Sequence, residues 1–180
     1  TRVGPVGQVD AIALWGWADV RLDHGAASFA IDETSDRYEA QDATVQWSTI
    51  ESSATSGHPE PEHNYGLIQG PDGARASVLN NLFAHNKNRN PALATGPSEV
   101  RGNVAYNVRH GFVHQNVAAG EFAIVGNSYL DGADDDLFPF FFDDEADGGD
   151  PGLQYFLADN YVDDPGVFTG VVDNPWSMPW

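Results

Sequence analysis

The sequence predicts an all-β protein whose chain winds into a parallel β-solenoid. Similar short segments recur every 22 to 33 residues, a spacing too short for a βαβ unit, and no helical period lies between them. Nineteen glycines and 11 prolines indicate many turns. An antiparallel sandwich with asparagines in its turns is the alternative, but no Asn-Gly pair marks a hairpin between alternating strands.

Each repeat has an apolar residue followed three positions later by a small polar one. In a solenoid, asparagines at one coil position stack and hydrogen-bond along the axis. We expect Asn81, Asn103, Asn127 and Asn160 to form such a ladder, with Asp23 and Ser48 in the earlier coils. The repeats are Val20–Asp23, Val45–Ser48, Val78–Asn81, Val100–Asn103, Ile124–Asn127 and Leu157–Asn160.

The composition bounds the class of protein. The 180 residues suit one domain over 1–180, and a net charge of −19 argues against a nucleic-acid surface, which needs a basic stripe. No apolar run reaches the roughly 20 residues of a membrane helix. The absence of cysteine excludes disulfides and thiolate metal sites. An acidic, soluble surface indicates a secreted protein.

The segment 80–91 combines a repeated element with a unique one. Its strand half matches the other coils, whereas its loop half occurs once and holds Lys87 and Arg89, two of only eight basic residues. A unique loop on a repeating scaffold is typical of a functional site. Longer insertions at 51–75 and 131–152 are expected to gather on one face of the solenoid, where they build a binding groove.

Residues 10–91 resemble bacterial pectate lyases of polysaccharide lyase family 1. The similar stretches are DAIALWGWADVRLDH, FAIDE, TVQWSTIES, HNYGLI and NNLFAHNKNRNP, in the family's order. The resemblance implies a right-handed parallel β-helix and a Ca²⁺-dependent lyase acting on pectate or a related uronic-acid polymer. Such lyases carry earlier coils and an N-terminal cap, so we expect residues 1–180 to be part of a longer protein that includes them.

The resemblance also implies site residues. Arg89 corresponds to the arginine that removes the C5 proton of galacturonate, and the alternative is an arginine that only bonds loop carbonyls. Asp32, Glu33 and Glu51 correspond to the coils whose carboxylates bind the catalytic Ca²⁺, hard oxygen ligands that this ion prefers. Solvated turn acids are the alternative for these three.

Substrate binding is expected at His58, His63, Asn64, Lys87 and Asn90. The loop that contains the two histidines also contains Glu60 and Glu62, so a zinc site is an alternative, although the spacing matches no familiar pattern. Ala92 and Ala94 stand where the family commonly has further arginines. Lys87 is expected to compensate in part, and Arg75 is the other cation close in sequence.

The tract 131–150 is acidic around an aromatic run at 137–142. The run is expected to pack on the solenoid flank, on a missing segment, or on a second copy. Asp143, Glu145, Asp147 and Gly148 resemble the start of an EF-hand loop, but Gln154 replaces its last ligand. A tail at 171–180, with Trp176 and Trp180, is expected to dock on another surface.

Two functions of different kinds follow. The first is a secreted Ca²⁺-dependent lyase whose partner is an acidic polysaccharide. The second is a non-catalytic β-helix module that binds polysaccharide or builds an extracellular surface assembly. A glycoside hydrolase would need paired carboxylates flanking the scissile bond, and Asp134, Asp135 and Asp136 offer acids without that context.

Overall fold

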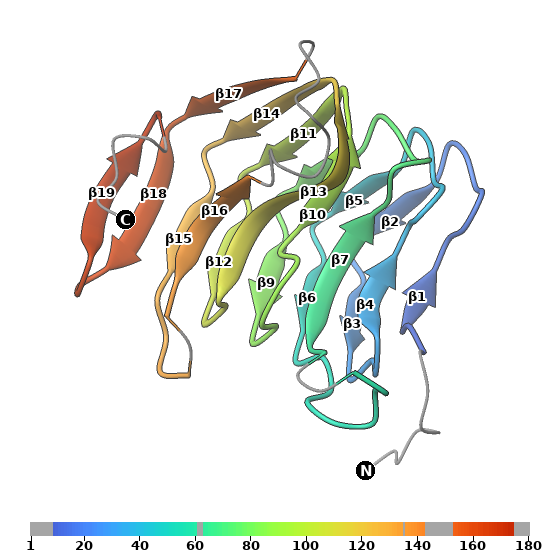
Figure 1. The fold of residues 1–180 in the computed structure, drawn as a ribbon, viewed down its shortest axis with the longest axis horizontal. Helices are drawn as coiled ribbons and strands as arrows, with labels where there is room; N and C mark the ends of the chain where they lie inside the picture. The colour runs from blue at the N-terminus through green and yellow to red at the C-terminus, as the bar shows by residue number, and fades with distance from the viewer. Residues whose placement is uncertain (1–8, 61–62, 135, 143–152, 175–180) are drawn as a thin grey trace.

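The computed structural model describes residues 9–60, 63–134, 136–142 and 153–174, and the side chains of 115–119 lie outside this description. The described part consists of strands and turns and contains no helix. Strands β1 to β18 visit three sheets in strict rotation, so that each turn of the chain adds one strand to every sheet (Figure 1). This is the predicted parallel β-helix, and the antiparallel sandwich is excluded.

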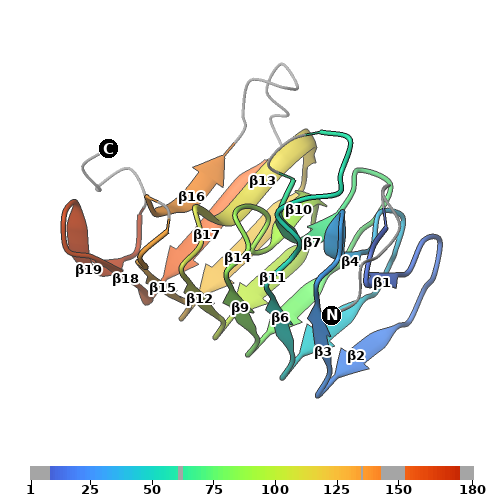
Figure 2. The same ribbon diagram turned by 90° about the horizontal axis from the view of Figure 1, so that it is seen from below.

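The strands of each sheet pair in parallel, coil upon coil, and lie one behind another along the solenoid (Figure 2). The first sheet contains β1 (Ile12–Ala13), β4 (Glu33–Asp36), β7 (Tyr65–Gln69), β10 (Ala92–Thr95), β13 (His110–Ala119) and β16 (Phe138–Phe142). The second contains β2 (Arg21–Asp23), β5 (Thr44–Gln46), β8 (Ser77–Leu79), β11 (Ser98–Arg101), β14 (Glu121–Val125) and β17 (Gln154–Ala158).

The third sheet contains β3 (Ala26–Ser28), β6 (Thr49–Glu51), β9 (Leu82–Ala84), β12 (Val104–Tyr106), β15 (Ser128–Leu130) and β18 (Asn160–Asp164), and β19 (Phe168–Val172) adds to it in antiparallel direction. Alternation along these strands sends every second side chain into the tube. Ile50 and Phe83 occupy one such interior column in adjacent coils and are both fully buried. The core is therefore a set of stacked apolar columns.

The asparagine ladder runs along the turn between the second and third sheets. The backbone N–H of Ser48 donates to Oδ1 of Asn81 at 3.0 Å, and the same bond links Asn81 to Asn103 (2.9 Å) and Asn103 to Asn127 (2.9 Å). Asn127 donates in turn to Asn160 at 3.2 Å. All four asparagine side chains are buried, so the ladder supplies the hydrogen bonds that these interior turns require.

The expected place of Asp23 in the ladder is wrong. Leu22, and not Val20, pairs with Val45, so the first coil is displaced by two residues from the expected alignment. The ladder position of this coil is Gly25, whose N–H donates to Oγ of Ser48 at 3.0 Å. Asp23 instead ends β2, where its carboxylate lies 2.5 Å from Nδ1 of His24. The first coil is the end of the ladder, so its ladder residue needs only a backbone N–H to donate to the next coil, and Gly25 supplies it without a side chain.

The aromatic run 137–142 is a coil strand. It forms β16, the last strand of the first sheet, and Phe140 is buried against Tyr129 at a ring distance of 5.0 Å. Phe138 and Phe141 face outward and are about two-fifths exposed, at 39% and 44%. The run thus packs within the solenoid, and docking of a further partner on its outer side remains a prediction.

Several expectations fall outside the described residues. These are positions 135 and 143–150 of the acidic tract, which include the EF-hand-like positions at 143–148, and the end of the tail with Trp176 and Trp180. In the part that is described, no helix is long and apolar enough to cross a membrane.

Candidate active site

One row of turns holds nearly all the predicted site residues. It is the row where the chain passes from a third-sheet strand to the next first-sheet strand. Asp32 and Glu33 lie between β3 and β4 or at the start of β4, the loop 52–64 joins β6 to β7, and the loop 85–91 joins β9 to β10. Because the coils stack in register, residues far apart in sequence meet along this row (Figure 1).

The loop with Arg89 is held close to the preceding coil. The N–H of Leu67 donates to the carbonyl of Arg89 at 2.7 Å, and Gly66 lies directly beneath the loop. A Cβ added at Gly66 would lie 2.5 Å from that carbonyl oxygen and 2.7 Å from Oδ1 of Asn90, so only glycine fits. Arg89 itself has a left-handed backbone, with φ of 62°, which turns its side chain out of the strand direction.

The guanidinium of Arg89 lies in a tight, largely buried setting. Its Cζ sits 4.3 Å above the ring centre of Tyr65, and Nη1 is bonded to Oε1 of Glu33. Its Nε is buried and makes no hydrogen bond to the described residues. Burial lowers the pKa of Arg89 to about 10, and the negative charge of Asp32 acts in the opposite direction.

Three carboxylates gather beside this arginine. Asp10, Asp32 and Glu33 each offer an oxygen within 4.8 Å of the others. Burial, followed by the charges of Asp36 and Asp32, raises the pKa of Asp10 to about 7. Crowded carboxylates disfavour one another's ionisation, and a cation among them relieves this repulsion. The oxygen donors fit a hard divalent cation such as Ca²⁺.

The structure brings Asp32 and Glu33 together but not Glu51. Glu51 is the last residue of β6, with Ser28 and Ala84 as its register partners in the third sheet. The described residues contain two clusters of metal-ligand side chains, and Glu51 belongs to neither. The physical reason is alternation: Ile50 points into the core, so Glu51 points outward from a sheet that precedes the turn.

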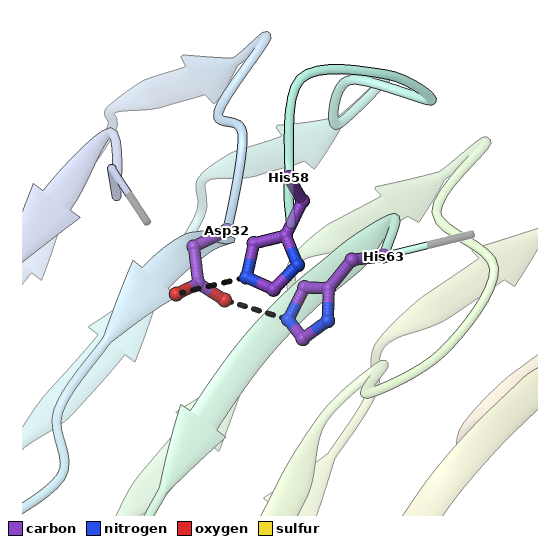
Figure 3. A group of neighbouring side chains, drawn as sticks. All are labelled: Asp32, His58 and His63. Atoms are coloured by element: carbon purple, nitrogen blue, oxygen red, sulfur yellow. Dashed lines mark ion pairs between the residues drawn. The ribbon is translucent and has the colours of Figure 1, made fainter. Parts of the chain in front are cut away.

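His58 and His63 lie over the same turn and face Asp32 (Figure 3). Their rings stack with centroids 3.8 Å apart, and Nε2 of His63 lies 2.6 Å from Oδ1 of Asp32. The ring of His63 also contacts Tyr65, at 3.7 Å between centroids. A continuous stack therefore runs from His58 through His63 and Tyr65 to Arg89.

A groove of about 410 Å³ adjoins the site without including Arg89. Lys87 and Asn64, two of the residues expected to bind substrate, line it, together with Phe29, Ser52, Ser53, Ala54, Thr55, His85, Asn107 and Asp134. Oδ1 of Asn64 accepts the N–H of Lys87 at 3.1 Å and the hydroxyl of Ser53. The groove is thus walled by the loops on both sides of the arginine.

Asn90 has a different setting. It is 2% exposed, and its Nδ2 donates to the carbonyls of Asn86 at 3.1 Å and His110 at 2.9 Å. These bonds fix the loop that carries Arg89. Substrate contact through Asn90 remains a prediction, and the observed contacts are internal.

Among the described residues, the site has few positively charged side chains besides Arg89 and Lys87, as the settings of Arg75 and Ala92 show. Arg75 pairs with Asp42 at 2.6 Å on the turn between β7 and β8, apart from the row that holds the site. Ala92 is fully buried and packs with Ile68 and Val113, so a small apolar cluster stands where the resembling lyases have more arginines.

Asp10 and Tyr65 also belong to this site, although their sequence context alone did not predict it. Both lie in stretches that carried the resemblance, at the start of DAIALWGWADV and within HNYGLI. The available signal was the coil register, in which Glu33 pairs with Tyr65 and the N–H of Glu33 donates to Oδ1 of Asp10 at 3.2 Å.

Comparison with known proteins supports the resemblance. The chain is 30% identical over 136 residues to a probable pectate lyase C of Aspergillus terreus, and the match covers 73% of this chain. The similarity to pectate lyases is thereby confirmed. The matched part spans about a third of the length of that relative, at 31%. No protein-family model matches the chain, and no solved structure matches it significantly.

Proposed function

We propose that the protein is a Ca²⁺-dependent polysaccharide lyase that cleaves pectate or a related uronic-acid polymer by β-elimination. The observation that carries the proposal is the buried Arg89, with its pKa lowered to about 10, directly beside the carboxylates of Asp32 and Glu33. The similarity to a probable pectate lyase supports the same reaction class.

Arg89 is the proposed base. Arginine has an ordinary pKa above 12, so a base role requires surroundings that favour its neutral form. Burial does so, whereas the negative charges of Asp32 and Glu33 oppose it. The arginine therefore becomes a competent base when the charge of these carboxylates is balanced by a cation, which links the activity to metal binding.

The carboxylates of Asp10, Asp32 and Glu33 would hold the Ca²⁺ ion. When bound, the ion supplies positive charge near the uronate carboxylate, which makes the C5 proton more acidic. Tyr65 holds the guanidinium plane from one side, and the internal bonds of Asn90 fix the loop.

The bond changes balance within the substrate. A nitrogen of neutral Arg89 takes the C5 proton, and the C–H electron pair becomes the double bond between C4 and C5. The C4–O bond breaks, its electrons remain on the leaving oxygen, and water protonates that oxygen; the hydroxide so formed takes the abstracted proton from Arg89, which is then neutral again. The products are an unsaturated uronate end and a free hydroxyl end.

The groove is the proposed site of the neighbouring sugar units. Lys87, on the loop between β9 and β10, provides its positive charge, and Asn64, His58 and His63 belong to the loop between β6 and β7. Because such polymers are too large to enter a cell, we place the protein outside it. The outer side of β16, with Phe138 and Phe141, is the proposed contact for a second copy or a further chain segment.

The test measures ultraviolet absorbance of the unsaturated uronate during incubation with polygalacturonate and related uronans at alkaline pH. We expect a rise with added Ca²⁺, no rise with chelator, and no rise for Arg89→Ala or Arg89→Lys. Arg75→Ala is the matched control, because Arg75 is exposed and its surface ion pair contributes little to stability.

Two outcomes contradict the proposal. Full activity of Arg89→Ala excludes this residue as the base. A folded protein that binds the polymer without product, and with equal affinity in the Arg89→Ala variant, is the non-catalytic module instead of the lyase.

A further inference from the structure

Asp32, His58 and His63 form a cluster whose donor atoms differ in kind from those of the carboxylate group. Nε2 of His63 lies 2.6 Å from Oδ1 of Asp32, and Nε2 of His58 lies 3.8 Å from its Oδ2 (Figure 3). One ligand atom from each residue lies within 4.8 Å of the others. With metal bonds of 2.0 to 2.2 Å, ligand atoms of a tetrahedral zinc site lie roughly 3.3 Å apart. The observed separations fall on both sides of that value.

The two Nε2 atoms are buried and make no hydrogen bond to the described residues. The side chain of His58 is 2% exposed and that of His63 is 9% exposed. Nε2 of His63 is in a close ion pair with Asp32, whereas Nε2 of His58 lies beyond hydrogen-bond distance of the same carboxylate. Buried polar nitrogens normally have partners, so the unbonded Nε2 of His58, which faces the same carboxylate as His63, indicates a missing ligand.

Glu60 contacts the other nitrogen of each ring. Its backbone carbonyl lies 3.3 Å from Nδ1 of His58, and its carboxylate oxygen lies 3.6 Å from Nδ1 of His63. Metal-binding histidines usually donate their second ring N–H to a carbonyl or a carboxylate. The N–H of Glu60 donates to Nδ1 of His58 at 2.9 Å, which places the proton of this ring on Nε2. Metal binding would require that proton to leave Nε2 and, if it moves to Nδ1, the N–H of Glu60 to give up this contact.

We propose that Asp32, His58 and His63 bind one divalent transition-metal ion of the zinc class. Imidazole nitrogens suit zinc, copper or nickel, whereas Ca²⁺ takes oxygen ligands. With three protein ligands, a fourth position is open to water or substrate. The site stands independently of lyase activity, although Asp32 is shared with the carboxylates of Asp10 and Glu33.

The ion would have a distinct neighbourhood. The ring of His63, one of the proposed ligands, contacts the ring of Tyr65, and the guanidinium of Arg89 lies over that ring of Tyr65. The proposed ion would therefore lie on the same turn row as the proposed base, where a sugar carboxylate or hydroxyl could take its fourth position.

The test uses chelator-stripped protein and titrates Zn²⁺ by calorimetry and Co²⁺ by visible absorbance. We expect one ion per chain and a Co²⁺ spectrum of low coordination number with nitrogen ligands. His58→Gln and His63→Gln should each weaken Zn²⁺ binding by at least about tenfold, since even outer-shell changes typically cost roughly 10- to 100-fold.

The controls separate this site from the carboxylates. His24→Gln removes an exposed histidine outside the cluster and should leave Zn²⁺ affinity unchanged. Asp10→Asn should leave Zn²⁺ binding intact while weakening Ca²⁺ binding, so either site can fail without the other. Circular dichroism confirms folding of each variant. Zn²⁺ affinity that is equal in wild type, His58→Gln and His63→Gln overturns the proposal, as does a wild-type protein that binds no Zn²⁺.

Discussion

Replacing Asn103 by alanine tests whether the ladder stabilises the solenoid. The side chain of Asn103 makes four hydrogen bonds. Its Oδ1 accepts from the backbone N–H and Nδ2 of Asn81 at 2.9 and 3.0 Å. Its Nδ2 donates to the carbonyl of Val78 at 2.8 Å and to Oδ1 of Asn127 at 3.0 Å. Alanine removes all four bonds from a buried turn.

The expected loss follows from these contacts. A typical hydrogen bond contributes about 0.5 to 1.5 kcal/mol net, so four contribute about 2 to 6 kcal/mol. The upper half of this range applies where the buried N–H of Asn81 is left without its acceptor. Asn103→Ser should lose about half as much free energy of unfolding as Asn103→Ala. At the equivalent position, the hydroxyl of Ser48 accepts the N–H of Gly25 and donates to the carbonyl of Gln46.

The assay is urea unfolding followed by tryptophan fluorescence, with free energies of unfolding compared among variants. Asn80→Gly is the matched control, because Asn80 is exposed, has φ of 54°, and corresponds to Gly102 and Gly126 in later coils. Its free energy should stay within about 1 kcal/mol of wild type. An alanine variant at position 103 that loses no more than this control refutes the ladder as a source of stability.

Three further predictions concern the interior and the site. Because the pKa of Asp10 is raised to about 7 in the folded protein, protonation of Asp10 stabilises the fold at low pH, and this contribution is lost as pH rises from about 4 through 7. In chelator, Asp10→Asn should therefore have the melting temperature of wild type at pH 3.5 and a higher one at pH 8. An equal difference in melting temperature at both pH values contradicts this. Arg37 is buried with both Nη atoms unbonded to the described residues, and burial lowers its pKa to about 10. Arg37→Met should therefore raise the free energy of unfolding in urea by up to about 3 kcal/mol, and a lower free energy of unfolding would show that the guanidinium is needed. Gly66→Ala would place its Cβ 2.5 Å from the carbonyl oxygen of Arg89 and so displace that loop. Lyase activity should fall, while Ca²⁺ affinity measured by calorimetry should persist. Unchanged activity would show that the loop of Arg89 and Asn90 can move aside.

The sequence predicted the coils well because their signal is periodic. An apolar column residue and a small polar residue at the next turn recur in the coils from Val45 to Asn160, and stacked coils must bury the one and hydrogen-bond the other. The first coil misled the alignment because Gly25 uses its backbone at the ladder position, and a backbone donor leaves no trace in a pattern of side chains.

The site was predicted in part. Asp32, Glu33 and Arg89 were expected from the resemblance, and the structure brings them together. Glu51 lies in another stretch that carried the resemblance, TVQWSTIES, yet alternation along β6 turns its side chain away from that cluster.

The sequence by itself determined the fold class, the ladder from Ser48 to Asn160 and the loop that carries Arg89, because each depends on a local pattern that repeats or conspicuously does not. Only the tertiary structure decided that Asp10 joins Glu33 and that His63 meets Asp32. Those contacts cross from one coil to the next, and the exact register and loop path that create them depend on how all the coils pack, which no single stretch of sequence encodes.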